Sequence, residues 1–182
     1  MKVITNNASA SVAGVKAQVK IKNENTFNEG GYENIPFEDR KAVKQLLEKL
    51  AQWGNADAAY ELFDLYVNGY FGEVEDRTSL EYLRQAANLG HSGALFVLGM
   101  YIINTPSTVE LFNHAVKLFS ESARRGFAHA EGVMSVMAND PKVAKHWRQK
   151  ALKHGCSQKD IELFESVLFI PLLMFGCPSF KA

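Results

Sequence analysis

The sequence lacks the charge excess and the cysteine framework that would assign it at once to a functional class. Its 20 Lys plus Arg residues balance 20 Asp plus Glu residues, so the formal net charge is zero. Nucleic-acid binding takes much of its affinity from basic side chains against phosphate, so no nucleic-acid partner is expected. The two cysteines, Cys156 and Cys177, fit no disulfide framework and no zinc or redox motif. Free thiols in a reducing compartment are therefore expected.

Long apolar runs are also missing. The first 15 residues are interrupted by Asn and Ser, which argues against a Sec signal peptide. No stretch reaches the roughly 18 apolar residues of a transmembrane helix, and the best candidate, residues 167–176, is short and contains Pro171. A cytoplasmic location is the expectation, with export by a route other than Sec left open.

Little in the sequence indicates catalysis. A metal site needs three or four converging ligands, whereas the five histidines are scattered along the sequence. The sequence also has no glycine-rich loop with the lysine that a phosphate-binding loop requires. The prediction is no catalytic residue, no metal and no cofactor. One enzymatic alternative stays open, a nucleophilic Cys156 with His154 or His146 as its base.

What is present is a repeat. Residues 1–36 are rich in Asn, Ser, Gly and Lys and predict a flexible or loosely docked arm. From residue 37 the apolar spacing is helical, and the segments "LEKLAQWG", "LRQAANLG", "FSESARRG" and "RQKALKHG" end in glycines spaced 36, 36 and 29 residues apart. Small residues before three of these glycines let the next helix cross closely, and each glycine suits a left-handed helix end. These glycines are Gly54, Gly90, Gly126 and Gly155.

A second helical pattern follows each glycine. Counting from the glycines places four apolar residues at equivalent positions: Leu62, Leu98, Met134 and Leu163. One helix pair cannot bury its apolar side alone, but stacked pairs can. The sequence therefore predicts a stack of helix pairs.

These residues resemble Sel1-like repeats, a tetratricopeptide-like class. The segment 56–90 keeps the small-x-small start, the leucine and tyrosine, the loop glycine and the Ala-Ala-x-x-Gly close. The resemblance implies an all-α fold, a right-handed α/α solenoid of about three to four helix pairs. A repeat domain is expected over residues 37–182, with repeats at about 56–91, 92–127 and 128–156 and partial repeats at 37–55 and 157–182.

The resemblance also implies a function, that of a non-enzymatic and often bacterial adaptor. In such stacks the first helix of each pair lines a concave groove that binds a peptide or protein. Carrying that register across predicts a partner-binding face of Asp57, Tyr60, Asp64, Asn68, Phe96, Met100, Asn104, His129, Val136 and Asn139. The same register adds Val67, Ile103, Gly132, Ile161 and Glu165. The competing interpretation, that Phe96 and Ile103 are core residues, stays open.

Two further interpretations concern partners. The chain could instead be a secreted effector, or the immunity or chaperone-type partner of a toxin. Weak self-association could run through the apolar C-terminal tail, or through charge poles formed by the basic run 142–159 and by acidic residues of the arm and of the loop near Glu73 and Glu75. A solvated helix face is the plainer interpretation of the basic run, and a buried cap is the plainer one of the tail.

Overall fold

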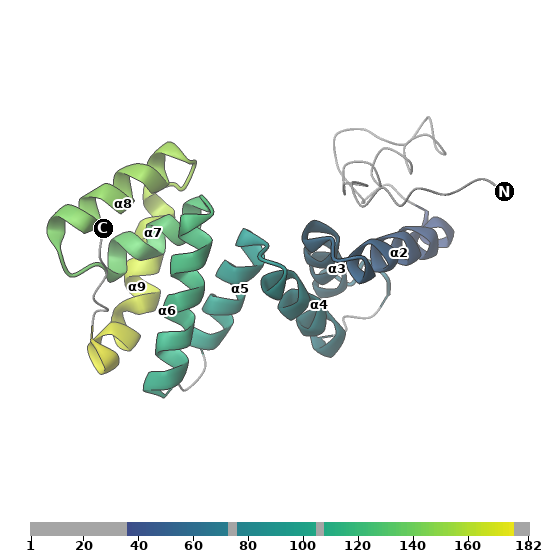
Figure 1. Ribbon diagram of the computed structural model, residues 1–182, viewed down its shortest axis with the longest axis horizontal. Coiled ribbons are helices and arrows are strands. Elements are labelled where there is room, and N and C mark those ends of the chain that lie inside the picture. Colours follow the sequence, from purple (N-terminus) through teal and green to yellow (C-terminus); the bar gives the residue numbers. More distant parts are fainter. Residues whose placement is uncertain (1–35, 73–75, 105–107, 177–182) are drawn as a thin grey trace. The chain divides into compact units, whose positions relative to one another are not determined.

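Every regular element in residues 36–72, 76–104 and 108–176, the ranges that the computed structural model describes, is an α-helix (Figure 1). Residues 1–35 of the predicted arm, Glu73 and Glu75 of the acidic pole, and Cys177 lie outside these ranges. The helices are α2 (Phe37–Gln52), α3 (Ala56–Val67), α4 (Asp76–Asn88), α5 (Ser92–Ile103), α6 (Val109–Arg124), α7 (Ala128–Met137), α8 (Pro141–Lys153) and α9 (Gln158–Phe175). The all-α prediction is confirmed.

The helices pack in the pairs that the repeat predicts. α3 packs chiefly on α4, α5 on α6, and α7 on α8. The chain divides between Leu89 and Gly90 into two compact units, the first holding α2 to α4 and the second α5 to α9. Each unit is described by itself below.

The closing glycines do what their position predicts. Gly54, Gly90, Gly126 and Gly155 have φ of +85°, +84°, +84° and +102°, the left-handed region that favours glycine. In the turn after α2, the Asn55 amide donates to the Leu50 carbonyl at 3.0 Å, and the turn after α6 repeats this bond. Each turn thus satisfies carbonyls that the helix end leaves unpaired.

In the first unit, α3 packs against both α2 and α4. Leu47, Leu62 and Leu83 contribute fully buried side chains, one from each helix. The Tyr66 and Tyr82 rings stack at 5.6 Å, and Gln85 Nε2 donates to the Ala51 carbonyl at 2.8 Å. These contacts join all three helices into one core.

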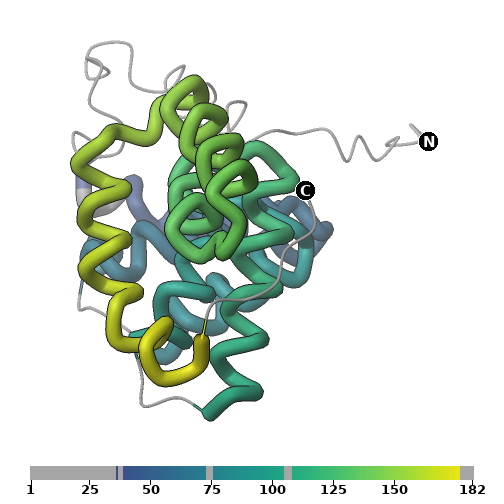
Figure 2. Tube along the Cα trace, turned by 90° about the vertical axis from the view of Figure 1, so that its left-hand side faces the viewer, coloured from purple at the N-terminus to yellow at the C-terminus, as the bar shows by residue number. Residues whose placement is uncertain are grey.

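In the second unit, α7 is the most buried helix and packs against α6, α8 and α9. Phe119 of α6 is fully buried and belongs to the same core cluster as Met134 of α7 and Leu168 of α9. In Figure 2, α9 is the yellow helix that ends beside the first turn of α6, where Phe175 stacks on Phe112 at 5.2 Å.

The structure corrects the predicted register of α9. The N-caps of α3, α5 and α7 directly follow their glycines, but α9 is capped by Ser157, two residues after Gly155. Phe164, not Leu163, therefore takes the position of Leu62 and Met134. Accordingly Phe164 is 5% exposed and Leu163 58%.

Some residues assigned to the groove lie in the core instead. Ile103 and Ile161 are 4% and 0% exposed, and Gly132 is also buried. For Ile103 the core interpretation was the correct one, because α5 is apolar around most of its circumference and hydrophobic spacing could not single out one face.

Candidate partner-binding surfaces

The predicted face of the first unit is polar and open. Asp57, Asp64 and Asn68 are exposed along α3 and its C-cap, and Tyr60 is partly buried beside Phe63, 5.7 Å between ring centroids. Asn68 Nδ2 donates to the Asp64 carbonyl at 2.8 Å, so this amide helps to cap the helix. Burial raises the pKa of the Tyr60 hydroxyl, and the carboxylates of Asp64 and Glu61 raise it further. The surface is therefore an acidic one around a half-buried ring.

The predicted residues of the second unit are mixed in exposure. Asn104 and Asn139 are exposed at helix ends, whereas Met100 and Val136 are partly buried against the core. Phe96 of α5 and His129 of α7 come together, with ring centroids 6.0 Å apart.

These two rings belong to an aromatic cluster of five side chains, the most extensive aromatic contact network in the described part of the chain. Phe96 lies 5.9 Å from Phe119, 5.3 Å from Phe127 and 5.9 Å from Phe164, centroid to centroid. Phe119 and Phe164 are buried and form its floor, while Phe96, Phe127 and His129 are partly exposed.

The edge of the cluster is polar. The His129 side chain is 44% exposed, and its Nε2 lies 3.9 Å from a carboxylate oxygen of Asp160. An apolar or aromatic side chain could pack on the exposed rings while a polar group met the His129–Asp160 pair.

Sequence reasoning missed Phe127, Phe164 and Asp160 as members of this surface. Phe127 occupies the N-cap position of α7 and makes no capping hydrogen bond there. A phenylalanine where Asn or Ser is preferred was the available signal that its ring has another role. Phe164 was missed because of the register shift in α9.

A buried carboxylate with two partly exposed partners joins α7 to α8. Glu131 is 0% exposed, and its carboxylate lies 2.9 Å from Lys150 Nζ and 2.8 Å from His154 Nδ1. Arg148 also reaches a carboxylate, that of Glu165 at 3.3 Å. Two members of the predicted basic pole therefore pair within the unit, while Lys142, Lys145 and Lys153 are exposed.

The same contacts bear on the enzymatic alternative. His154 directs Nδ1 to Glu131, and Cys156 Sγ lies 3.7 Å from the Ser157 carbonyl, in donating geometry. Cys156 is 2% exposed, and burial raises the pKa of its thiol, as do the charges of Asp160 and Glu131. A nucleophilic cysteine needs a lowered pKa and access to substrate, so this environment is the opposite of an activating one.

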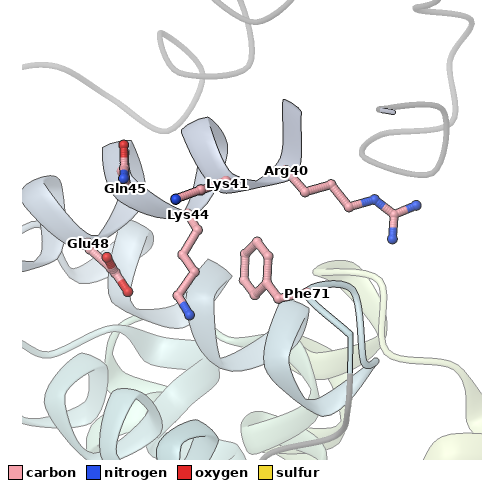
Figure 3. A pocket seen from close by; sticks show the side chains of 6 residues that line it. All are labelled: Arg40, Lys41, Lys44, Gln45, Glu48 and Phe71. Atoms are coloured by element: carbon pink, nitrogen blue, oxygen red, sulfur yellow. The ribbon is translucent and has the colours of Figure 1, made fainter. Parts of the chain in front are cut away.

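A hollow in the first unit was not predicted. It has a volume of about 410 Å³ and lies beside α2, and Figure 3 shows Lys44 extending alongside the Phe71 ring. Lys44 Nζ is 5.0 Å from the Tyr66 ring centroid, and the Arg40 guanidinium lies over Tyr70 at 4.4 Å. The hollow is thus basic with an aromatic wall; its lining is Arg40, Lys41, Lys44, Gln45, Glu48 and Phe71.

In the described ranges, none of the helices has both the length and the apolar character to cross a bilayer. Among the same residues, no three His, Cys, Asp or Glu side chains converge in a way that could hold a metal ion.

Comparisons with known proteins support the fold. No family model matches the chain. The chain is 28% identical over 139 residues to the chitin synthase regulator SKT5 of Malassezia restricta, a match of 71% of this chain but only 10% of that much longer protein. The crystal structure of a Sel1 repeat protein from Oxalobacter formigenes superposes with a TM-score of 0.56 at 24% identity, covering 68% of this chain and 97% of the other. The chain has the fold of a Sel1 repeat protein, as the resemblance predicted.

Proposed function

We propose that this protein is a non-enzymatic adaptor that binds a peptide or protein segment on the exposed sides of the first helices of its repeats. The observation that carries the proposal is the aromatic cluster. Three partly exposed rings lie on a floor of buried rings, and one of the three, His129, has a carboxylate oxygen of Asp160 at 3.9 Å. Such a surface offers apolar area at low entropic cost, because the rings are already held in place.

Each unit, considered by itself, would offer its own contact chemistry. In the second unit, Phe96, Phe127 and His129 would take an apolar or aromatic side chain, with Met100 and Val136 extending the apolar contact. The exposed amides of Asn104 and Asn139 in the same unit would bond the backbone of the bound segment. The α3 surface of the first unit is a separate candidate, where the exposed carboxylates of Asp57 and Asp64, with Asn68 at the end of the helix, would favour a basic ligand.

The comparisons favour regulation over catalysis. The curated relative is named as a regulator of an enzyme, and the structural relative is a repeat protein. By analogy, this chain would act by holding a partner. The cytoplasmic location and the bacterial source stay predictions, and so does the alternative of a secreted effector or toxin partner.

The test is selection of a phage-displayed peptide library on the folded protein. Peptides with an aromatic or large aliphatic residue should be enriched. Phe127→Ser and His129→Ser should each weaken binding of a selected peptide about tenfold or more, since anchor contacts carry most interface energy. Fluorescence anisotropy would measure the change.

Leu111→Ser is the matched control, because Leu111 is an exposed apolar residue on α6, 42% accessible, outside the cluster. It should bind the selected peptide like the wild type. If both cluster variants bind as tightly as the control, the aromatic cluster is not the binding surface. Circular dichroism would confirm that all variants stay folded.

A further inference from the structure

One face of α9 is apolar and uncovered. Phe169, Ile170, Leu173 and Met174 are 64%, 63%, 75% and 67% exposed. Their spacing of one, four and five residues places them on one side of two successive turns. We call these four residues the α9 face. The opposite side of the same turns is docked, with Leu168 and Pro171 buried and Phe175 stacked on Phe112.

The α9 face is free of charge, unlike the first half of the same helix. No charged residue occurs from Ser166 to Gly176, whereas Asp160, Glu162 and Glu165 precede it. The only other large exposed hydrophobic residue of α9, Leu163, stands next to Glu162 and two residues before Glu165. A charge-free surface gives no electrostatic preference for an acidic or a basic partner, so its occupant must be apolar.

Two further exposed apolar residues lie on α6, near the end of α9. Phe112, which stacks on Phe175, is in the first turn of α6 with Val109 and Leu111, and these two are 53% and 42% exposed. The first turn of α6 and the end of α9 therefore lie together (Figure 2). Isolated exposed apolar residues are ordinary on protein surfaces, but a group of four on adjacent turns of one helix, as in the α9 face, is typical of an interaction site.

We propose that the α9 face pairs with the α9 face of a second copy of this chain. Each of the four side chains leaves roughly 100 Å² open, so a symmetric pair, with its rim on α6, would bury on the order of 1,000 Å² in total. That area is at the lower limit for a specific interface. A two-turn apolar stripe is also self-complementary, because two such stripes can pack as crossed helices about a two-fold axis. Apolar, charge-free contact is the composition typical of homodimers.

This pairing would leave the aromatic cluster accessible. Phe164, in the cluster floor, precedes Ile170 by six residues, or about 9 Å along the helix, and is buried on the inner side. A dimer would therefore present two copies of the proposed peptide site.

The experiment is sedimentation velocity of the full chain from about 1 to about 300 µM, a range that brackets a weak dimer. The wild type should shift from monomer to dimer within this range. Leu173→Glu and Ile170→Glu should each remain monomeric throughout. Leu163→Glu, an equally drastic change at an exposed leucine of the same helix, should dimerise like the wild type.

A wild type that stays monomeric at every concentration would overturn the proposal, and so would a dimer that survives both face variants. Flotation with phosphatidylcholine vesicles tests whether lipid occupies the α9 face instead. Vesicle binding by a monomeric wild type, and its loss in Leu173→Glu, would assign the face to lipid. A monomeric Leu173→Glu that still binds the selected peptide separates this proposal from the peptide-binding one. The substituted side chains are exposed, and circular dichroism would confirm their fold.

Discussion

The helix pairs α3–α4 and α7–α8 occupy the same place in the repeat but build their contacts differently. Four residues after the N-cap, α3 has Ala59, fully buried and neutral. At the matching position α7 has Glu131, equally buried but charged. The other first helices, α5 and α9, have Leu95 and Ile161 there. One position of the fold therefore accepts a methyl group, an aliphatic chain or a carboxylate.

The second helix of the pair decides which of these is tolerated. α8 brings Lys150 and His154 to the carboxylate, whereas the matching residues, counted back from the closing glycine, are Gln85 in α4 and Leu89 just after it. A buried charge is tolerated when its partners are present and is costly when they are not. The repeat therefore determines where the backbone of each helix runs. Which side chain a given position accepts is determined by its partner residues on the neighbouring helix.

The largest expected effect comes from removing one partner of the buried Glu131 carboxylate while the carboxylate itself stays. Lys150→Met keeps an unbranched apolar side chain but removes the ammonium group, which lies 2.9 Å from the Glu131 carboxylate and 4.9 Å from the Trp147 ring centroid. We expect the free energy of unfolding to fall by about 2 to 3 kcal/mol, because a fully buried carboxylate is left with His154 alone. Urea denaturation followed by circular dichroism would measure it.

The companion variant makes the site resemble its counterparts. Glu131→Leu reproduces the aliphatic residue of α5 and α9, and its unfolding free energy should lie within about 1 kcal/mol of the wild type or exceed it. Lys150→Met should then cost little in the Glu131→Leu background. Equal losses from Lys150→Met in both backgrounds would show that the lysine stabilises through packing and not through the carboxylate.

A second difference between helix pairs concerns which helix supplies the larger side chain. Eight residues after the N-cap, α3 has Phe63 whereas α5 has Gly99. Seven residues before the closing glycine, α4 has Leu83 whereas α6 has Phe119. A Cβ added at Gly99 would lie 2.7 Å from Phe119 Cε1, so in α5–α6 the large ring comes from the second helix and the small residue from the first.

Gly99→Ala tests whether the missing side chain at Gly99 makes room for the Phe119 ring. It should lower the unfolding free energy by about 1 to 3 kcal/mol, since a fully buried ring must move. In a Phe119→Leu background the same substitution should cost less, by at least about 0.5 kcal/mol in a double-mutant cycle. Strict additivity of the two changes would contradict the proposed exchange of volume. Differential scanning fluorimetry would rank the four proteins, and urea titration would quantify them.

The fold was readable from the sequence because its signals are local. The glycine at each helix end and the small residues before it act within one turn of the chain, and the structure places both as predicted. Site residues such as Phe96 and His129 could be assigned to helices and to a side. The contacts of Phe96 with His129 and Phe164 could not be predicted, because these three residues come from different repeats. Nor could the pairing of Glu131 with His154, which joins residues 23 apart in sequence.

The smallest expected effect concerns the turn that differs from the other three. After Gly54, Gly90 and Gly126 the next residue is the N-cap, but after Gly155 an additional residue, Cys156, precedes it and is buried. In a Cys177→Ser variant at pH 8, iodoacetamide should alkylate Cys156 at least about tenfold more slowly in the folded protein than in urea, because the thiolate is the reactive form and burial disfavours it. Mass spectrometry would follow the reaction.

The raised pKa of Cys156 also predicts the sign of a pH effect. Below about pH 8 the thiol is largely protonated in both the folded and the unfolded chain, so its contribution to stability is fully present. As the pH rises, the unfolded chain releases the proton first, and the stability contributed by this group declines until the folded thiol also ionises. Cys156→Ala should remove that decline, seen as a smaller difference in unfolding free energy between pH 7 and pH 9.5. A folded Cys156 that alkylates as fast as the unfolded chain would mean that the additional residue leaves the turn open, and that the last repeat closes less tightly than the three before it.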